Sequence, residues 1–446
     1  MLSKSKIVRG IRCQKSLWLN VHKPELSLVA PSQQAIFARG TDVGVLARDY
    51  FPGGELALTG DRPDTGSVDR TRELIRQGVK TIYEATFVYD HTLVAVDILT
   101  CIDGRWNLVE CKSTTGVKPE HITDVAVQYY VVTGAGIALE DASVIHLNNR
   151  YIRKGEQEIK NLFSCKSVLT EVQQKQEFVG KNIVPLLEML GNDEPAMGMG
   201  KQCTDPYECD FQVYCRSLQP LKPVPEPDHT PIIRKDAIHK QLENFGYPVY
   251  FLDFETISPA IPMFDESRPY QQIPFQYSLH YRETREGETF HSAYLAWPDG
   301  DPRRELIEQL INDTRQPGKI LTYNVSFERT RLKELARDFP PYKIELEGII
   351  NRLEDLMPVF RRKEWHAPSM GRGYSIKTVL PLMAPELSYE TMEIANGGDA
   401  SSQFLRLYGN EDQQLIERTR KALLEYCYLD TWAMVRIMDE LEKIVF

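Results

Sequence analysis

A proline-rich stretch near the middle of the chain, Pro220-Leu-Lys-Pro-Val-Pro-Glu-Pro-Asp-His-Thr-Pro231, sets the first limit on how the chain folds. Proline lacks a backbone N–H and has a fixed φ, so five prolines in twelve residues form a stiff, extended linker. With 446 residues the chain is also too long for one ordinary hydrophobic core. We therefore predict a first domain over residues 1–219, a linker over 220–235 and a second domain over 236–446.

Both regions alternate between short apolar strands and helices, which predicts two mixed α/β domains. The predicted elements of the first region are strands at 81–88, 93–100, 106–111 and 143–147 and a helix at 121–133. Those of the second region are strands at 249–254, 275–281, 289–295 and 320–323 and a long final helix at 411–444. The segment Gly371-Arg-Gly-Tyr-Ser-Ile-Lys377 is interpreted as a turn before a helix at 376–383 rather than as a phosphate-binding loop.

Three charged residues in apolar strands form a candidate site in the first region. Asp97 lies within Leu-Val-Ala-Val-Asp-Ile-Leu, and Glu110 and Lys112 share one face of the next strand because side chains alternate with a period of two. Carboxylates from neighbouring strands can bind a divalent cation, and an ammonium group can stabilise charge on a phosphate. An ordinary edge-strand ion pair explains the spacing equally well. Gln128 on the following helix can reach back toward these residues, which favours a site for phosphodiester hydrolysis.

Asp97, Glu110-x-Lys112 and Gln128 with Tyr130 resemble the core of the PD-(D/E)xK nucleases, in particular the RecB-like and CRISPR-adaptation exonucleases. The resemblance covers about residues 1–220 and implies a restriction-endonuclease-like fold. It implies that the Asp and the Glu bind Mg²⁺ or Mn²⁺, that the Lys assists hydrolysis and that the Gln-bearing helix contacts DNA. The sequence departs from the family in two places. The family's Gly-x-x-x-His is Gly40-x-x-x-Gly44 here, and the tyrosine of Gln-x-x-x-Tyr is displaced to 129 and 130.

Three closely spaced cysteines, Cys203-x5-Cys209-x5-Cys215, precede the proline-rich stretch. The sequence has neither a signal-peptide-like segment nor the ~20 consecutive apolar residues of a membrane helix, which predicts a cytoplasmic protein that does not enter a membrane. Structural disulfides are not expected in that compartment, so the cysteines indicate a metal site. Cys13 is the candidate for a fourth ligand.

In the same nuclease family a lone N-terminal cysteine and a C-terminal cysteine triplet hold a [4Fe–4S] cluster. The resemblance therefore implies that Cys13 and the triplet hold such a cluster and tie together the two ends of the first domain. Four thiolates also bind zinc, and the spacing does not decide between the two. The family's usual Cys-x2-Cys is absent here, and free thiols are a third interpretation.

The second region carries acids on three separate segments. Asp253 and Glu255 point to the same side of an apolar strand, where a bound cation would offset their repulsion. Glu328 begins a helix, and Tyr426 and Asp430 share one face of the final helix at positions i and i+4. Brought together, these groups can form a two-metal site for attack on a phosphodiester. Each motif alone also arises by chance.

Asp253-x-Glu255, Asn324-x-x-Phe327-Glu328 and Tyr426-x3-Asp430 resemble the DEDD exonucleases of the RNase H-like, DnaQ-like fold, in the variant with a tyrosine in its last motif. The resemblance covers about residues 245–446. It implies that the first two acids and the last one hold Mg²⁺ or Mn²⁺, that Glu328 binds metal directly or through water, and that Tyr426 positions the attacking water. Family members remove nucleotides from three-prime ends. Glu328 stands where the family has Asp.

Together these motifs resemble an uncharacterised bacterial family that joins a RecB-like domain to a DEDD-like domain. They predict a metal-dependent nuclease acting on single-stranded or end-bearing DNA in repair, recombination or defence, with RNA open as a substrate and a helicase or a repair or defence protein as a candidate partner. Residues 236–446 hold 25 Lys and Arg against 34 Asp and Glu, a charge that does not favour tight DNA binding. The alternatives are a nucleic-acid-binding or scaffold protein with inactive sites and a structural zinc protein, although the latter leaves the embedded carboxylates unexplained.

Overall fold

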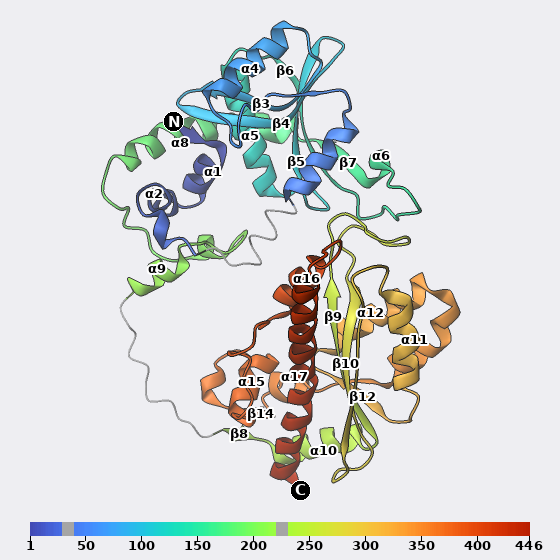
Figure 1. The fold of residues 1–446 in the computed structure, drawn as a ribbon. Coiled ribbons are helices and arrows are strands. Elements are labelled where there is room, and N and C mark those ends of the chain that lie inside the picture. The colour runs from blue at the N-terminus through green and yellow to red at the C-terminus, as the bar shows by residue number, and fades with distance from the viewer. Residues whose placement is uncertain (29–39, 220–230) are drawn as a thin grey trace. The chain divides into compact units, whose positions relative to one another are not determined.

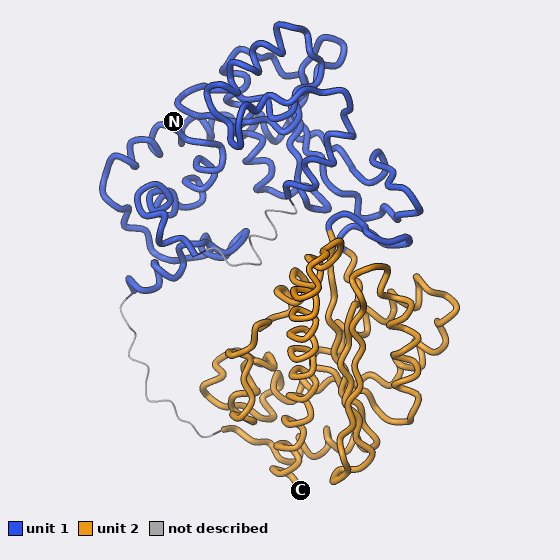
Figure 2. Tube along the Cα trace, viewed as in Figure 1, with its two compact units in different colours: residues 1–222, 260–270 blue, residues 223–259, 271–446 orange. Residues whose placement is uncertain are grey.

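The computed structural model of the chain describes residues 1–28, 40–219 and 231–446. The fold is mixed α/β and forms two compact units, one of residues 1–222 with 260–270 and one of residues 223–259 with 271–446 (Figure 2). Residues 220–230 of the predicted linker lie outside the described residues. Its last residues belong to folded elements, since β8 spans Ile232–Ile233 and α10 begins at Lys235. Among the described helices, none is long and apolar enough to cross a membrane.

The first unit is built on a seven-stranded mixed sheet (Figure 1). Its strands, in sheet order, are β2 (Glu55–Leu56), β3 (Thr81–Tyr89), β4 (Thr92–Ile102), β5 (Arg105–Lys112), β6 (Leu139–Leu147) and β7 (Phe163–Ser167). The short strand β1 (Leu2–Ser3) pairs parallel with β4. Strands β3, β4 and β5 pair antiparallel, as expected of alternating segments joined by tight turns. The four strands predicted in this region are confirmed.

Helices cover one face of this sheet. They include α1 (Lys4–Arg12), α2 (Gln14–His22), α4 (Thr65–Arg76), α5 (Pro119–Gly134), α7 (Leu169–Gln174) and α8 (Gln176–Leu190). Ile7 of α1, Val125 of α5 and Ile183 of α8 are fully buried in one apolar cluster with the sheet. The predicted helix at 121–133 is therefore confirmed as α5. The short helices α6 (Ile159–Leu162) and α9 (Gln212–Ser217) also belong to this unit, and residues 40–47 are helical as well.

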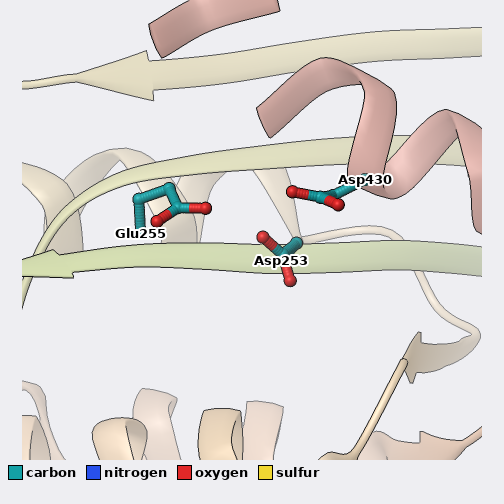
Figure 3. Close-up of side chains that lie close together, drawn as sticks. All are labelled: Asp253, Glu255 and Asp430. Atoms are coloured by element: carbon teal, nitrogen blue, oxygen red, sulfur yellow. The ribbon is translucent and has the colours of Figure 1, made fainter. Parts of the chain in front are cut away.

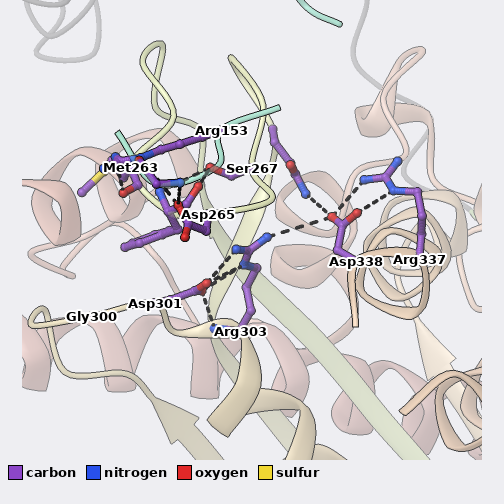
Figure 4. A network of polar contacts seen from close by, with 12 residues as sticks. Arg153, Met263, Asp265, Ser267, Gly300, Asp301, Arg303, Arg337 and Asp338 are labelled. Carbon is purple, nitrogen blue, oxygen red and sulfur yellow. Dashed lines mark hydrogen bonds and ion pairs between the residues drawn. The ribbon is translucent and has the colours of Figure 1, made fainter. Parts of the chain in front are cut away.

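Residues 260–270 belong to the first unit although the strands before and after them belong to the second. Ala260 and Ile261 pack into an apolar cluster with Ile145 of the sheet. The guanidinium group of Arg153 donates hydrogen bonds to the carbonyl oxygens of Pro262 and Met263 at 3.0 and 2.7 Å (Figure 4). The domain boundary predicted from the sequence did not include this excursion of the chain.

The second unit contains a five-stranded sheet in the order β11 (Thr289–Leu295), β10 (Ile273–Arg282), β9 (Val249–Ile257), β12 (Lys319–Thr322) and β13 (Leu353–Asp355). The first three strands pair antiparallel, and β9, β12 and β13 pair parallel. The four strands predicted here are confirmed. A separate two-stranded sheet pairs β8 with β14 (Trp365–His366).

Helices lie on both faces of the five-stranded sheet (Figure 1). They are α10 (Lys235–Phe245), α11 (Arg303–Asp313), α12 (Val325–Asp338), α13 (Lys343–Arg352), α14 (Pro358–Arg361), α15 (Ile376–Met383), α16 (Gly397–Leu405) and α17 (Gln413–Val445). Tyr250, Leu252 and Phe254 of β9 pack in one apolar cluster with α11, α12 and α13. Because side chains alternate along a strand, Asp253 and Glu255 point to the opposite face, which α17 covers.

Two carboxylate sites and a cysteine pocket

Three carboxylates of the second unit meet at one point. Asp253, Glu255 and Asp430 each offer an oxygen within 4.8 Å of the other two. Figure 3 shows the first two on β9 and the third on α17, with the side chains close together. Glu255 is 6% and Asp430 8% exposed, so both carboxylates are largely withdrawn from water. The structure thus brings together three of the predicted site residues, and hard oxygen ligands in this arrangement suit Mg²⁺ or Mn²⁺.

The electrostatics of these three groups favour a bound cation. Burial raises the pKa of Asp253 well above its ordinary value, and the charge of Asp430 raises it further. Burial and the same neighbour raise the pKa of Glu255. Burial raises the pKa of Asp430 to about 6, against the effect of a hydrogen bond from Tyr389. A divalent ion would offset both the burial and the repulsion, which is the physical reason to expect one here.

Glu328 lies near this cluster without joining it. It is in the first turn of α12, is 2% exposed and has one side-chain oxygen without a hydrogen-bond partner. Burial raises its pKa to about 8. Its charge acts on both Asp253 and Glu255, but it is not among the carboxylates that lie within 4.8 Å of one another. Glu328 therefore lies beside the three-carboxylate cluster, near enough for its charge to act on two of the cluster's members.

Tyr426 is buried beside the cluster, one helical turn before Asp430. Two further residues contact this pair, and no motif in the sequence predicted either of them. The Lys377 ammonium lies 3.5 Å from the Tyr426 hydroxyl oxygen, and the Tyr389 hydroxyl donates a 2.7 Å hydrogen bond to Asp430. Lys377 is in the first turn of α15 and is the last residue of the segment interpreted as a turn. The sequence could not show that Lys377 lies close to these acids, because that closeness depends on the fold.

In the first unit Asp97 stands at the centre of a row of three acids on adjacent strands. On one side, Glu84 of β3 and Asp97 lie between the paired residues Tyr83–Ile98 and Ala85–Val96. On the other, Glu110 of β5 directly follows the pair Ile98–Val109, and the charges of both glutamates act on Asp97. Glu84 has a φ of 54°, which is uncommon for a residue other than glycine and marks a local distortion of the strand. The backbone N–H of Cys111 donates a 2.6 Å hydrogen bond to Asp97.

Glu110 is 2% exposed and both of its side-chain oxygens accept hydrogen bonds. One oxygen accepts from Lys4 at 2.6 Å and from Lys112 at 2.8 Å, and the other accepts from the Gln128 amide. Lys112 has a second ion-pair partner in Asp124. Gln128 thus reaches back from α5 to the predicted site, whereas Lys4 and Asp124 are site residues that the sequence did not predict.

The lysines set the charge of this first site. Burial raises the pKa of Asp97 to about 8, and the charge of Glu110 raises it as well. Burial also raises the pKa of Glu110, but the ammonium groups of Lys112 and Lys4 outweigh it and hold that pKa below its ordinary value. In the described part of the first unit no three carboxylates lie within 4.8 Å of one another. The two sites therefore differ in charge, because lysine ammonium groups already neutralise a carboxylate of the first site.

Four cysteines from the two ends of the first unit line one small pocket. Cys13 lies between α1 and α2, and Cys203, Cys209 and Cys215 lie shortly before the predicted linker. Burial raises the pKa of Cys13, and its thiol-bearing neighbours raise it further. Arg9 of α1 pairs with Asp210 at 2.7 Å, and the Arg12 side chain donates to the Gln202 carbonyl oxygen at 2.8 Å. These contacts hold α1 to the cysteine-bearing segment.

The spacing of these sulfur atoms bears on which metal group fits. No three of the four lie within 4.8 Å of one another, among residues that are all described. Four thiolates around one zinc ion, at a Zn–S distance of about 2.3 Å, would place their sulfurs about 3.8 Å apart. The sulfur atoms in this structure are therefore not arranged as a preformed tetrahedral zinc site.

Part of the chain is similar to known proteins. Residues 250–375 match the family described as "Domain of unknown function (DUF2779)", a stretch that contains all of β9 except Val249, contains Glu328 and ends before α17. A Mycoplasma pneumoniae protein named "Uncharacterized protein MG366 homolog" is 30% identical over 210 residues, which cover 42% of this chain and 31% of that protein. The Mycoplasma genitalium protein named "Uncharacterized protein MG366" is 28% identical over 222 residues, 44% of this chain and 32% of that protein.

A Ureaplasma parvum protein named "Uncharacterized protein UU173" is 26% identical over 221 residues, 44% of this chain and 31% of that protein. The chain thus spans about a third of the length of the curated relatives it matches. Neither the family description nor these names states an activity, so what the chain does is inferred from its own residues.

Proposed function

We propose that the chain is a metal-dependent nuclease that hydrolyses phosphodiester bonds in DNA, with its principal site at Asp253, Glu255 and Asp430. The observation that carries this proposal is the convergence of three carboxylates from a central strand and a distant helix, each within 4.8 Å of the others. Burying mutually repelling charges costs free energy unless a cation binds there. Mg²⁺ or Mn²⁺ at such a site polarises the phosphate and lowers the pKa of the attacking water.

The remaining residues of this site divide the other tasks. Glu328, which has one buried oxygen without a hydrogen-bond partner, would hold a water beside the bound ion. The Tyr426 hydroxyl orients the attacking water, and the nearby ammonium of Lys377 limits the positions open to that hydroxyl. The hydrogen bond from Tyr389 would hold the carboxylate of Asp430 in place for binding the ion.

The architecture supports an RNase H-like fold of the DEDD exonuclease type for the second unit. Its sheet has three antiparallel strands followed by two parallel ones, the first acids lie on the central strand β9, and the last motif lies on the long final helix α17. The proposed activity is removal of nucleotides from three-prime ends of single-stranded or end-bearing DNA. We place this activity in the bacterial cytoplasm, in repair, recombination or defence, with a helicase or another protein of those processes as partner.

For the first unit we propose a PD-(D/E)xK nuclease fold, with Asp97 and Glu110 as metal ligands, Lys112 assisting hydrolysis and Gln128 on the helix that faces DNA. The row of acids across adjacent strands and the amide of Gln128 on Glu110 support it. A second candidate function for this unit is nucleic-acid binding without catalysis. It is favoured by the two lysine ammonium groups that already neutralise Glu110 and by the glycine at position 44.

We further propose that Cys13, Cys203, Cys209 and Cys215 hold a [4Fe–4S] cluster with a structural role. Support comes from the pocket that the four share and from the contacts that hold α1 to the cysteine-bearing segment. When bound, the cluster supplies covalent links between the segment at Cys13 and the segment at residues 203–215. It would thereby hold α1 and α2 against the segment that leads to the linker.

The nuclease proposal is tested by digesting labelled single- and double-stranded DNA with Mn²⁺. Asp253→Asn should lower three-prime-end digestion by roughly a hundredfold or more, because it removes a metal ligand. Lys112→Ala tests the first site in the same assay. Asp236→Asn, an exposed residue of α10, is the matched control and should digest DNA like the parent. Equal digestion by the parent, Asp253→Asn and Lys112→Ala would show that neither site is a nuclease.

A further inference from the structure

Lys4 is the first residue of α1 and reaches the middle of the first site. Its ammonium lies 2.6 Å from the Glu110 carboxylate, closer than the Lys112 ammonium on the same oxygen. The Lys4 side chain is 19% exposed, so the contact is largely shielded from water. An ion pair at this distance with a carboxylate that is 2% exposed is far stronger than one on the surface. Lys4 is therefore part of the site and not of a solvated N-terminal helix.

The fold holds Lys4 in this position. Strand β1 directly before it pairs with β4, the strand that carries Asp97. The Ser3 hydroxyl caps α1 by accepting the backbone N–H of Lys6. Ile7 of the same helix is fully buried against the core. Because the backbone is fixed on both sides of Lys4, its side chain is directed at Glu110. The flexible aliphatic part of the side chain still lets the ammonium group move within the site.

The two lysines are held differently. Lys112 pairs with Asp124 as well as with Glu110, so it keeps a partner when Glu110 binds something else. Lys4 is held at the site by its ion pair with Glu110. A divalent ion that takes the same Glu110 oxygen repels both ammonium groups, and Lys4 is the one without the Asp124 anchor. It would then be the cation left facing the DNA phosphate.

We propose that Lys4 is a further functional residue of the first site, where it competes with a divalent cation for Glu110 and, once displaced, binds a phosphate of the nucleic acid. This inference rests on the proposed metal and nucleic-acid binding of that site, but not on whether the site cleaves DNA. It makes Lys4 a phosphate-binding residue whose charge opposes metal binding. If Lys4 had a purely structural role, it would favour both metal binding and phosphate binding.

The test uses the chain of 446 residues carrying Asp253→Asn, which removes the principal metal site of the second unit. Lys4→Met, Lys4→Arg and Lys6→Met are compared in this background, the last as a lysine on the same helix. Mn²⁺ affinity is measured by calorimetry, and the affinity for a short single-stranded DNA is measured in Ca²⁺ over a range of salt concentrations. Circular dichroism and thermal unfolding check that each variant is folded.

Lys4→Met should bind Mn²⁺ about tenfold more tightly, because a competing positive charge is gone. It should bind DNA more weakly and reduce the slope of log affinity against log salt by about one. Lys4→Arg should keep the salt slope, and Lys6→Met should keep both properties. An unchanged or weaker Mn²⁺ affinity in Lys4→Met, or an unchanged salt slope, overturns the inference.

The outcome also separates this inference from the nuclease proposal. If the background chain shows these Lys4 effects but cleaves no DNA, the inference is supported and catalysis by the first unit is contradicted. If the background chain cleaves DNA but Lys4→Met changes neither the Mn²⁺ affinity nor the salt slope, the nuclease proposal is supported and the inference is overturned.

Discussion

Asp97 sits between two other acids, Glu84 and Glu110, in strands that pair side by side. Burial raises its pKa from an ordinary 3.8 to about 8. Between those two pH values the folded chain holds a proton on Asp97 that the unfolded chain has released. The stability that this residue contributes is therefore present at low pH and is lost as the pH rises from about 4 to about 8.

We predict that Asp97→Asn becomes more stable relative to the parent as the pH rises through this window. Asn does not titrate, so the difference in unfolding free energy should change by up to about 1.4 kcal/mol per pH unit in favour of the variant. Urea unfolding in EDTA at a series of pH values measures it. Asp103→Asn, an exposed residue of the turn between β4 and β5, is the control and should follow the parent. A constant difference between Asp97→Asn and the parent would contradict the shifted pKa.

Several site residues follow from the sequence alone because a local period places them. The alternation of a strand puts Asp253 and Glu255 on one face, and helical spacing puts Tyr426 and Asp430 on another. Lys4 could not be predicted in this way, since its contact with Glu110 spans 106 positions of the chain and depends on how α1 docks. Basic residues near an N-terminus occur equally on solvated helices, so composition does not indicate that Lys4 enters the site.

Helix α1 links the first site to the cysteine pocket. Lys4 at its start contacts Glu110, and Cys13 directly after its end lines the pocket. The helix packs tightly at Gly10, where an added Cβ would lie 2.7 Å from a methyl carbon of Leu17 and 2.8 Å from one of Leu186. Both leucines are buried, so they have little room to move.

At this scale we predict that Gly10→Ala destabilises the chain relative to Gly44→Ala by about 1–3 kcal/mol, because overpacking outweighs the gain in helix propensity. Gly44 also lies in a helical segment, but a Cβ there meets nothing within 4 Å. Urea unfolding followed by circular dichroism compares the two variants. Equal stability of the two would mean that α1 does not pack against α2 and α8 as described.

The division of the chain into two units was predictable from the proline-rich stretch, but the excursion of residues 260–270 was not. Ala260 and Ile261 precede a strand of the second unit in sequence, yet they pack in a cluster of the first. Their apolar character gave no sign of which core they join. The strands and long helices were predictable for the opposite reason, since the periodicity of each lies within the element itself.

For the whole molecule we predict that the chain, purified without oxygen, contains iron bound by its cysteine pocket. Cys209→Ser should lose the iron and unfold at a lower temperature, because α1 and α2 lose their link to the segment before the linker. Cys165→Ser is the control, since Cys165 is exposed on β7 and lies outside the pocket. Metal analysis and thermal unfolding provide the measurements. A chain with stoichiometric zinc and no iron would contradict the cluster assignment.

The central claim is that Asp253, Glu255 and Asp430 bind a divalent metal ion. Crystals of the chain grown with Mn²⁺ test it directly through the anomalous scattering of that ion. The account predicts an anomalous peak coordinated by the three carboxylates, which Asp253→Asn weakens or abolishes. The absence of a peak at this position in the parent crystals, with Mn²⁺ saturating and the pH above the raised pKa values, would contradict it.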